Sequence, residues 1–300
     1  HGFDGWHRNS GALGMTNRFS VIDLSALPPP DVIEMLDYEG IVTAMRDDLV
    51  SRFPLIQGVI DLESEPARKL IEVFAYRELG LRARVNDAAR AVMLAFALGS
   101  DLDHIGARYA VERLAGEDDE RFRKRVALAP EALSVAGPVG AYQFHALTAD
   151  VSIHDVSVIT DRPGRVIVTV MMRGENPVPD AEMLLKVRRV INSHVVRPLT
   201  DEVVVTGPQT LQTDINVRLS LYPGPDASLV GTNARNAIIA LINRTHHLGY
   251  DLKKSAIYAA AHQEGVHGVE ILAPLSDLIT TARQLVVVRN VNVTVTGRDL

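Results

Sequence analysis

The feature that most constrains the fold of this 300-residue chain is a change of hydrophobic period near residue 150. Before that point, apolar residues recur at spacings of three, four and seven, which is the period of a helix with one apolar face. After it, short runs alternate between apolar and polar residues or are rich in β-branched side chains, which indicates strands. Because the helices precede the strands, the pattern predicts an α+β protein and excludes the steady alternation of a doubly wound enzyme.

The second half is expected to form two small α+β units, at residues 150–208 and 209–300. In the first unit a turn signal at residues 161–164 separates two strand-like runs, and a helical run and a further strand follow, which gives the order β-β-α-β. In the second unit residues 211–221 alternate strongly, and two helical runs and two strands follow, in the order β-α-α-β-β. The predicted architecture is therefore a helical N-terminal half followed by two small α+β units.

Residues 31–149 are expected to form a helical domain. Asp31 is placed to cap a first helix that reaches about Phe53, where the next residue is a proline. Pro66 suits the first turn of a second helix, which would be about 50 Å long if it ran unbroken to Leu98.

This second helix carries an apolar stripe at helical spacing. The stripe residues that we single out as candidate partner contacts are Leu70, Phe74, Leu81, Val85, Val92 and Phe96. Such a stripe packs either into the core of its own domain or partly against another subunit, and the spacing alone does not separate the two arrangements.

No part of the N-terminal region is expected to belong to the hydrophobic core. Residues 1–14 are interpreted as a tag or an upstream extension, expected to be disordered, before a possible start at Met15. Residues 15–30 are expected to form an extended arm, because the three consecutive prolines at its end fix φ and remove N–H donors. We expect the arm to dock on a neighbouring subunit, through the candidate contacts Leu24, Leu27 and Pro29.

Composition argues against several functions. The 31 Lys and Arg residues against 37 Asp and Glu residues give a net charge of −6, which disfavours sequence-independent binding of nucleic acid. The chain has no cysteine, so it has no disulfide and no cysteine-based zinc site. It has no apolar run of the length that a transmembrane helix needs, so no membrane insertion is expected.

No reactive constellation stands out either. The dinucleotide, phosphate-loop, nucleophile-elbow and zinc-protease motifs are absent. The acidic run at residues 117–120 lies at an expected helix start, so we interpret its carboxylates as solvated rather than catalytic. The sequence therefore predicts no catalytic, cofactor-binding or metal-binding residue and no enzyme. The alternatives are an envelope-degrading hydrolase, which would need two carboxylates in a cleft, and a nucleic-acid-binding module.

Several short segments resemble the baseplate J-like family of contractile phage tails and R-type pyocins. The segments that carry the resemblance are DLSALPPPDVIE at 23–34, LESEP at 62–66, AYREL at 75–79, AARAVML at 88–94, GSDLD at 99–103, LAPEALSVAGP at 128–138, RPLTD at 197–201, YPGP at 222–225 and SAIY at 255–258. Each segment is weak evidence by itself, and their order along the chain makes the resemblance specific.

The resemblance implies a structural subunit of the baseplate wedge, without catalytic residues or cofactors. It implies association with a second copy of the chain and with another wedge protein, through a helical bundle and a dimerising α+β region. The wedges would close a ring around the hub, next to the sheath initiator, and the ring's rearrangement on host contact would start sheath contraction. It also implies assembly in the cytoplasm of the producing bacterium and later presence in the released phage or bacteriocin particle.

Overall fold

The computed structural model describes Leu24, Leu27, Pro28 and residues 30–298, except residues 135, 194, 195, 199 and 225. The described residues form two compact units. The helical unit comprises the residues up to Arg113 together with Glu117–Ala127, and the α+β unit comprises Leu114–Gly116 and the residues from Leu128 onward. The order of the elements confirms the prediction of an α+β fold with a helical N-terminal half. The domain boundaries expected at residues 149, 208 and 209 stay a prediction, and residues 1–14 lie outside the described residues.

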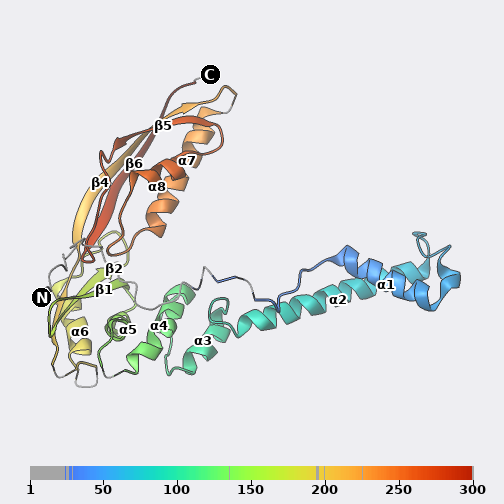
Figure 1. Ribbon diagram of the computed structural model, residues 1–300, viewed down its shortest axis with the longest axis horizontal. Coiled ribbons are helices and arrows are strands. Elements are labelled where there is room, and N and C mark those ends of the chain that lie inside the picture. Colours follow the sequence, from blue (N-terminus) through green and yellow to red (C-terminus); the bar gives the residue numbers. More distant parts are fainter. Residues whose placement is uncertain are drawn as a thin grey trace, which may run out of the picture. The chain divides into compact units, whose positions relative to one another are not determined.

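A helical hairpin forms the first part of the helical unit (Figure 1). It consists of α1 (Tyr38–Arg52), a short 3-10 turn η2 (Pro54–Ile56) and α2 (Pro66–Ala91). Ile41 of α1 and Ile71 of α2 are buried where the two helices pack. The proline after α1 ends that helix as expected, because proline disfavours the helical conformation of the residue before it.

The first helix begins later than the sequence predicts. Its N-cap is Asp37, whose carboxylate accepts a hydrogen bond from the Gly40 amide at 3.0 Å, whereas Asp31 lies in a turn. The preceding segment is held by a distant residue instead. The Asn86 side chain of α2 accepts from the Glu34 amide at 3.1 Å and donates to the Glu34 carbonyl at 2.9 Å. These two bonds satisfy backbone groups that a longer α1 would have used.

The second helix is shorter than the sequence predicts. It ends at Ala91, so its 26 residues span about 39 Å rather than 50 Å. The chain then turns before α3 (Gly99–Ala107) begins. The turn is held from a distance, because the Arg123 guanidinium donates to the Leu94 carbonyl at 2.8 Å and to the Ala97 carbonyl at 2.7 Å.

The acidic run at residues 117–120 was expected to be solvated, and for one of its carboxylates this is wrong. Glu117 is 6 % exposed and precedes α4 (Asp119–Ala132). Arg121 and Arg125, which are also buried, donate to the two oxygens of this carboxylate. The two guanidinium groups compensate the loss of hydration, which allows the carboxylate to be buried.

The α+β unit begins with α5 (Val139–Ala149) and a three-stranded sheet. The strands are β1 (Ile153–Arg162), β2 (Arg165–Met172) and β3 (Glu202–Thr206), with α6 (Ala181–Ile191) between the last two. The sheet order is β1-β2-β3. The β1–β2 pair is an antiparallel hairpin, and β2 and β3 are parallel because α6 provides the crossover. This order is the predicted β-β-α-β.

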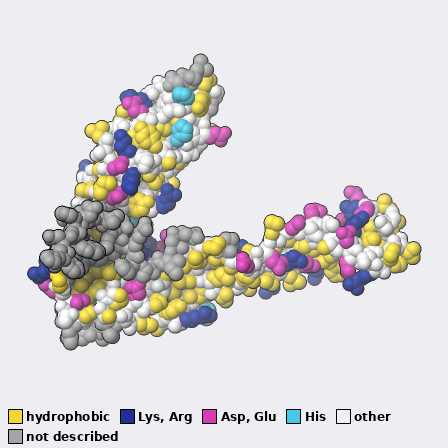
Figure 2. All heavy atoms as spheres, in the orientation of Figure 1, with side chains coloured by type: hydrophobic (Ala, Val, Ile, Leu, Met, Phe, Trp, Pro, Cys, Tyr) yellow, Lys and Arg dark blue, Asp and Glu magenta, His cyan; other side chains and the backbone are white. Residues whose placement is uncertain are grey.

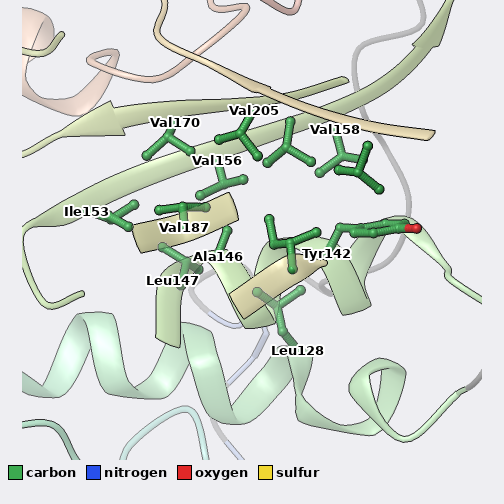
Figure 3. Close-up of a cluster of buried hydrophobic side chains, with 13 residues drawn as sticks. Leu128, Tyr142, Ala146, Leu147, Ile153, Val156, Val158, Val170, Val187 and Val205 are labelled. Carbon is green, nitrogen blue, oxygen red and sulfur yellow. The ribbon is translucent and has the colours of Figure 1, made fainter. Parts of the chain in front are cut away.

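One apolar core holds this sheet to its helices (Figure 3). Val156, Val158 and Val170 of the sheet lie in one cluster with Leu147 of α5 and Val187 of α6. Alternate residues of a strand point to the same face, so Val156 and Val158 of β1 and Val170 of β2 share the face that packs against α5 and α6. Residues 167–171 of β2 are all buried, so both faces of this central strand are covered.

A second three-stranded sheet follows, with order β5-β4-β6. Its elements are β4 (Gln209–Leu221), α7 (Ala227–Arg244), α8 (Lys254–Ala261), β5 (Val266–Ala273) and β6 (Gln284–Arg298), which is the predicted β-α-α-β-β order. Ile215, Val217, Leu219 and Leu221 of β4 are buried under α7 and α8, as the alternation predicts. β4 is the central strand, antiparallel to β5 and parallel to β6, so β6 is an edge strand of this sheet.

Candidate partner interface

An exposed apolar face runs along α2 (Figure 2). Five of the stripe residues are between 57 % and 64 % exposed: Leu70, Phe74, Leu81, Val85 and Val92. Soluble monomers rarely leave a contiguous apolar face of this kind in water, and such faces mark interaction sites. We refer to these five side chains as the α2 stripe.

The face of α2 that packs on α1 is a different one. Ile71, Ala75 and Asn86 are the buried residues of α2, and they are offset from the stripe around the helix axis. Asn86 holds the backbone of Glu34, as described above. The α2 stripe therefore forms no part of the core of the described chain, which leaves contact with another subunit as the open alternative.

The structure does not bring all nine candidate contacts together. Phe96 lies beyond the end of α2 and is partly buried. In the arm, Leu24 is partly buried and Leu27 is 45 % exposed, whereas Pro29 lies outside the described residues. Whether any of the nine contacts a partner stays a prediction.

The connection between α1 and α2 exposes further apolar side chains that the sequence reasoning missed. Leu55 is 85 % exposed, and Phe53 and Leu62 are about half exposed. The signal for them was present, since Leu55 and Leu62 lie between the expected end of the first helix, near Phe53, and the expected start of the second. A group of apolar side chains in an exposed turn is a candidate for contact with another protein.

Two basic side chains lie beside the α2 stripe. Arg77 and Arg84 are exposed and are seven residues apart, so they project from the same side of the helix. Neither has an ion-pair partner among the described residues. By contrast Arg82, farther round the helix, pairs with Glu78 at 2.6 Å and with Glu34 at 3.2 Å. The stripe is thus apolar with unpaired positive charge along one side.

The buried ionisable groups form structural pairs. Glu117 is enclosed by two arginines, as described above. The Tyr142 hydroxyl donates to the Asp201 carboxylate at 2.6 Å, and burial together with this bond raises the pKa of Tyr142. Among the described residues, no three or more His, Asp or Glu side chains are grouped as metal ligands would be. In this same part of the chain, no helix combines the length and the apolar character that crossing a bilayer requires.

A long helix with an uncovered apolar face is typical of assembly proteins, which present such surfaces to partners. The comparisons with known proteins agree with this class. Family models of the baseplate J-like N-terminal domain and the baseplate J-like central domain match residues 63–118 and 134–207. Baseplate protein J of Escherichia phage P2 is 43 % identical over 284 residues, which cover 88 % of this chain and 94 % of the phage protein. This chain belongs to the baseplate J-like family.

Proposed function

We propose that this protein is a structural subunit of the baseplate of a contractile tail or tail-like injection particle, and that it acts as a wedge protein. Its family membership supports the structural baseplate role and a place in the tail of the particle. In the proposed wedge, the chain associates with a second copy of itself and with another wedge protein, and it contacts the hub and the sheath initiator. It would be assembled in the cytoplasm of the producing bacterium and released with the particle.

The observation that carries this proposal is the α2 stripe. Four apolar side chains of the 26-residue α2 and that of Val92 at its C-cap, each more than half exposed, lie on one face. Complete burial of a whole apolar side chain is worth about 1.5–3 kcal/mol. Because these side chains are already partly covered, burying the rest of each one would contribute roughly 1 kcal/mol to the free energy of association. A partner helix that packed along the stripe, as helices pack in a bundle, would bury these side chains and obtain this free energy.

Such interfaces would also give the wedge a means of switching. Packed helical interfaces have discrete arrangements rather than continuous ones, so a small change at the rim of a ring can move many subunits together. We propose that rearrangement of these contacts on host binding transmits the trigger for sheath contraction.

The proposal is tested by placing charge on the stripe. We expect the double variant Leu81→Glu, Val85→Glu to keep the thermal midpoint of the isolated protein within a few degrees, because both positions are exposed. Because charge in an apolar interface is strongly unfavourable, we also expect it to lose co-purification with the other baseplate proteins on co-expression.

The matched control adds the same two charges to exposed positions of α1, as Thr43→Glu, Ser51→Glu. This variant should assemble like the wild type. Unchanged assembly of the stripe variant, measured by size-exclusion chromatography and electron microscopy of the complex, would contradict the proposal.

A further inference from the structure

The second sheet has an edge strand that lacks the usual protection against pairing. β6 is the outermost strand of the order β5-β4-β6, and within the part of the chain that the structure describes it pairs with β4 alone. Its residues 290–296, with the sequence NVNVTVT, contain no charged residue and no proline. Unpaired N–H and C=O groups are a template for another strand, and natural proteins usually protect such an edge with charge, proline or a covering segment. The composition of this edge therefore indicates a strand that a partner strand covers.

The opposite edge of the same sheet is protected. β5 is eight residues long and carries the exposed Glu270, whose carboxylate pairs with Arg218 of β4 at 2.9 Å. A charged side chain on an edge strand opposes pairing with a further strand. The two edges differ in this respect, and β6 is the edge suited to an added strand.

A groove between α7 and β6 leaves room for the side chains of such a strand. It has a volume of about 360 Å³ and lies on the face of the sheet that α7 covers (Figure 1). Two valines of β6 line it, and the α7 residues that line it are mostly small: Val293, Val295, Ala227, Ser228, Gly231, Thr232 and Arg235. The Val295 side chain lies 3.5 Å from the position that a Cβ atom on Gly231 would occupy. Apolar side chains of an added strand would lie beside these valines.

The backbone of β6 presents its free groups at the valines. The Thr294 hydroxyl donates to the Val217 carbonyl of β4 at 3.4 Å, so this carbonyl faces β6. Val217 is in register with Val293, and in a parallel pair only one of two residues in register directs its backbone groups to the other strand. In agreement, Arg235 of α7 donates to the Val291 carbonyl at 3.3 Å. The backbone groups of Val291 and Val293 therefore point away from β4.

The regular part of β6 is short and is centred on Val293. The register of β6 with β4 shifts before Val291 and after Val295, so residues 291–295 are regular and both flanks are not. Irregularities of this kind bend a strand and end its pairing. We propose that β6 pairs antiparallel with β6 of a second copy of this chain, about a two-fold axis through Val293, so that the two three-stranded sheets become one.

The sequence of β6 is complementary to itself about this axis. Val293 faces itself, Val291 faces Val295 of the second copy, and Asn292 faces Thr294 of the second copy. Apolar residues thus meet on the groove face and polar residues meet on the other face, and no like charges meet. An axis one residue away in either direction would pair only part of the regular segment. The inference names the strand through which the second copy of the proposed wedge would bind, so it rests on that proposed association.

Introduced cysteines test the position of the axis in the full chain, which has no cysteine of its own. We expect Val293→Cys to form a disulfide-linked dimer on mild oxidation, because the residue faces itself at a Cα separation of about 5.5 Å. Val291→Cys is the matched control, since it is also partly buried on the same face but lies about 13 Å along the strand from its own counterpart. It should form no disulfide alone and should form one when mixed with Val295→Cys chains. Non-reducing electrophoresis and peptide mapping measure these products.

Charges on the other face of β6 provide a second measurement. In Asn292→Lys, Thr294→Lys each lysine would face a lysine of the second copy, so the dissociation constant of the dimer should rise about fivefold. Asn292→Lys, Thr294→Glu places opposite charges across the axis and should restore dimerisation. Both positions are exposed, so circular dichroism of the two variants should match that of the unsubstituted chain. Sedimentation equilibrium measures the dissociation constants, and equal values for the two variants would overturn the pairing.

A photocrosslinker tests whether the occupant is a second copy. Attached to the thiol of the Val293→Cys variant in the co-expressed baseplate complex, it should capture another chain of the same protein. Capture of a different baseplate protein at this position would overturn the inference.

Failure of this inference is distinguishable from failure of the proposed function. If Val293→Cys forms no disulfide while its thiol reacts with a soluble reagent in the folded protein, or if Val291→Cys alone forms as much, the pairing of β6 is overturned and the baseplate role is untouched. If the disulfide forms but Leu81→Glu, Val85→Glu leaves assembly unchanged, the pairing stands and the proposed role of the α2 stripe fails.

Discussion

At the scale of single residues, the Glu117 carboxylate is a buried charge whose loss the fold would feel. It is buried together with Arg121 and Arg125, and each guanidinium group donates to one of its oxygens. A buried ion pair adds little to stability by its presence, but removing one partner leaves the other charge without compensation. Two arginines pair with this carboxylate, so its loss affects both of them.

We therefore expect Glu117→Gln to lower the free energy of unfolding by about 3 kcal/mol, because it removes a buried negative charge to which two buried guanidinium groups donate. Urea denaturation followed by circular dichroism measures this difference. The matched control is Glu120→Gln, an exposed carboxylate of the same acidic run, which should change stability by less than about 0.5 kcal/mol. Equal effects of the two substitutions would show that the buried pair has no special role.

Asp150 makes the stability of the α+β unit depend on pH. Burial alone would raise the pKa of this carboxyl group, but hydrogen bonds from Lys186 and Ser152 outweigh burial and lower the pKa to about 2. A carboxyl group whose pKa is lowered by folding contributes stability above its ordinary pKa and loses that contribution as the pH falls toward 2.

Between pH 5 and pH 2.5, we expect the unfolding free energy of the wild type to fall by about 1 kcal/mol more than that of Asp150→Asn, which has no charge to lose. The full shift in pKa would give about twice this value, and the exposure of the Lys186 ammonium reduces it. Urea titrations of both proteins at the two pH values provide the measurement. Parallel pH dependence of the two proteins would contradict the assignment.

At the scale of elements, α2 contains a site where its stability can be raised without a change in contacts. Gly80 lies in the middle of the helix, and a Cβ atom added there would meet no atom within 4 Å. Alanine loses less backbone entropy than glycine in a helix. Gly80→Ala should therefore stabilise the helical unit by about 0.5–1 kcal/mol, measured as an increase in the thermal midpoint.

Gly137→Ala is the contrasting substitution. Gly137 has φ +67°, and an added Cβ atom would lie 2.7 Å from Cγ of Pro198. Alanine at this position is strained both by the backbone conformation and by the contact, so it should destabilise the protein. If both glycine substitutions changed the midpoint in the same direction, backbone conformation would not be the deciding factor.

At the scale of the whole molecule, the proposed contact along the α2 stripe predicts an acidic partner surface. Arg77 and Arg84 would face carboxylates on a partner helix at the same seven-residue spacing. Arg77→Glu, Arg84→Glu should therefore slow association with the partner, with little effect on the isolated chain, and added salt should speed the association of this variant because it screens the repulsion.

Binding of the purified partner at low and high ionic strength measures this effect. Arg52→Glu with Arg108→Glu is a suitable control, because both residues are exposed and lie outside α2. Equal loss of binding in the two variants would show that overall charge, rather than the two stripe arginines, governs association.

The sequence by itself determined the type and order of the elements. Periodicity is a local property, so the change near residue 150 and the β-β-α-β and β-α-α-β-β orders could be predicted from neighbouring residues. The candidate stripe was visible for the same reason, because residues at helical spacing share a face wherever the helix lies.

Only the tertiary structure decided where α1 begins, where α2 ends, which carboxylate is buried and which face of α2 stays exposed. The two helix boundaries depend on residues far away in the sequence, and the burial of Glu117 depends on what the folded chain packs around it. Asn86 holds Glu34, Arg123 holds the turn after α2, and Arg125 reaches back to Glu117. Local pattern cannot predict such contacts, since a side chain is buried or exposed according to what the folded chain brings against it.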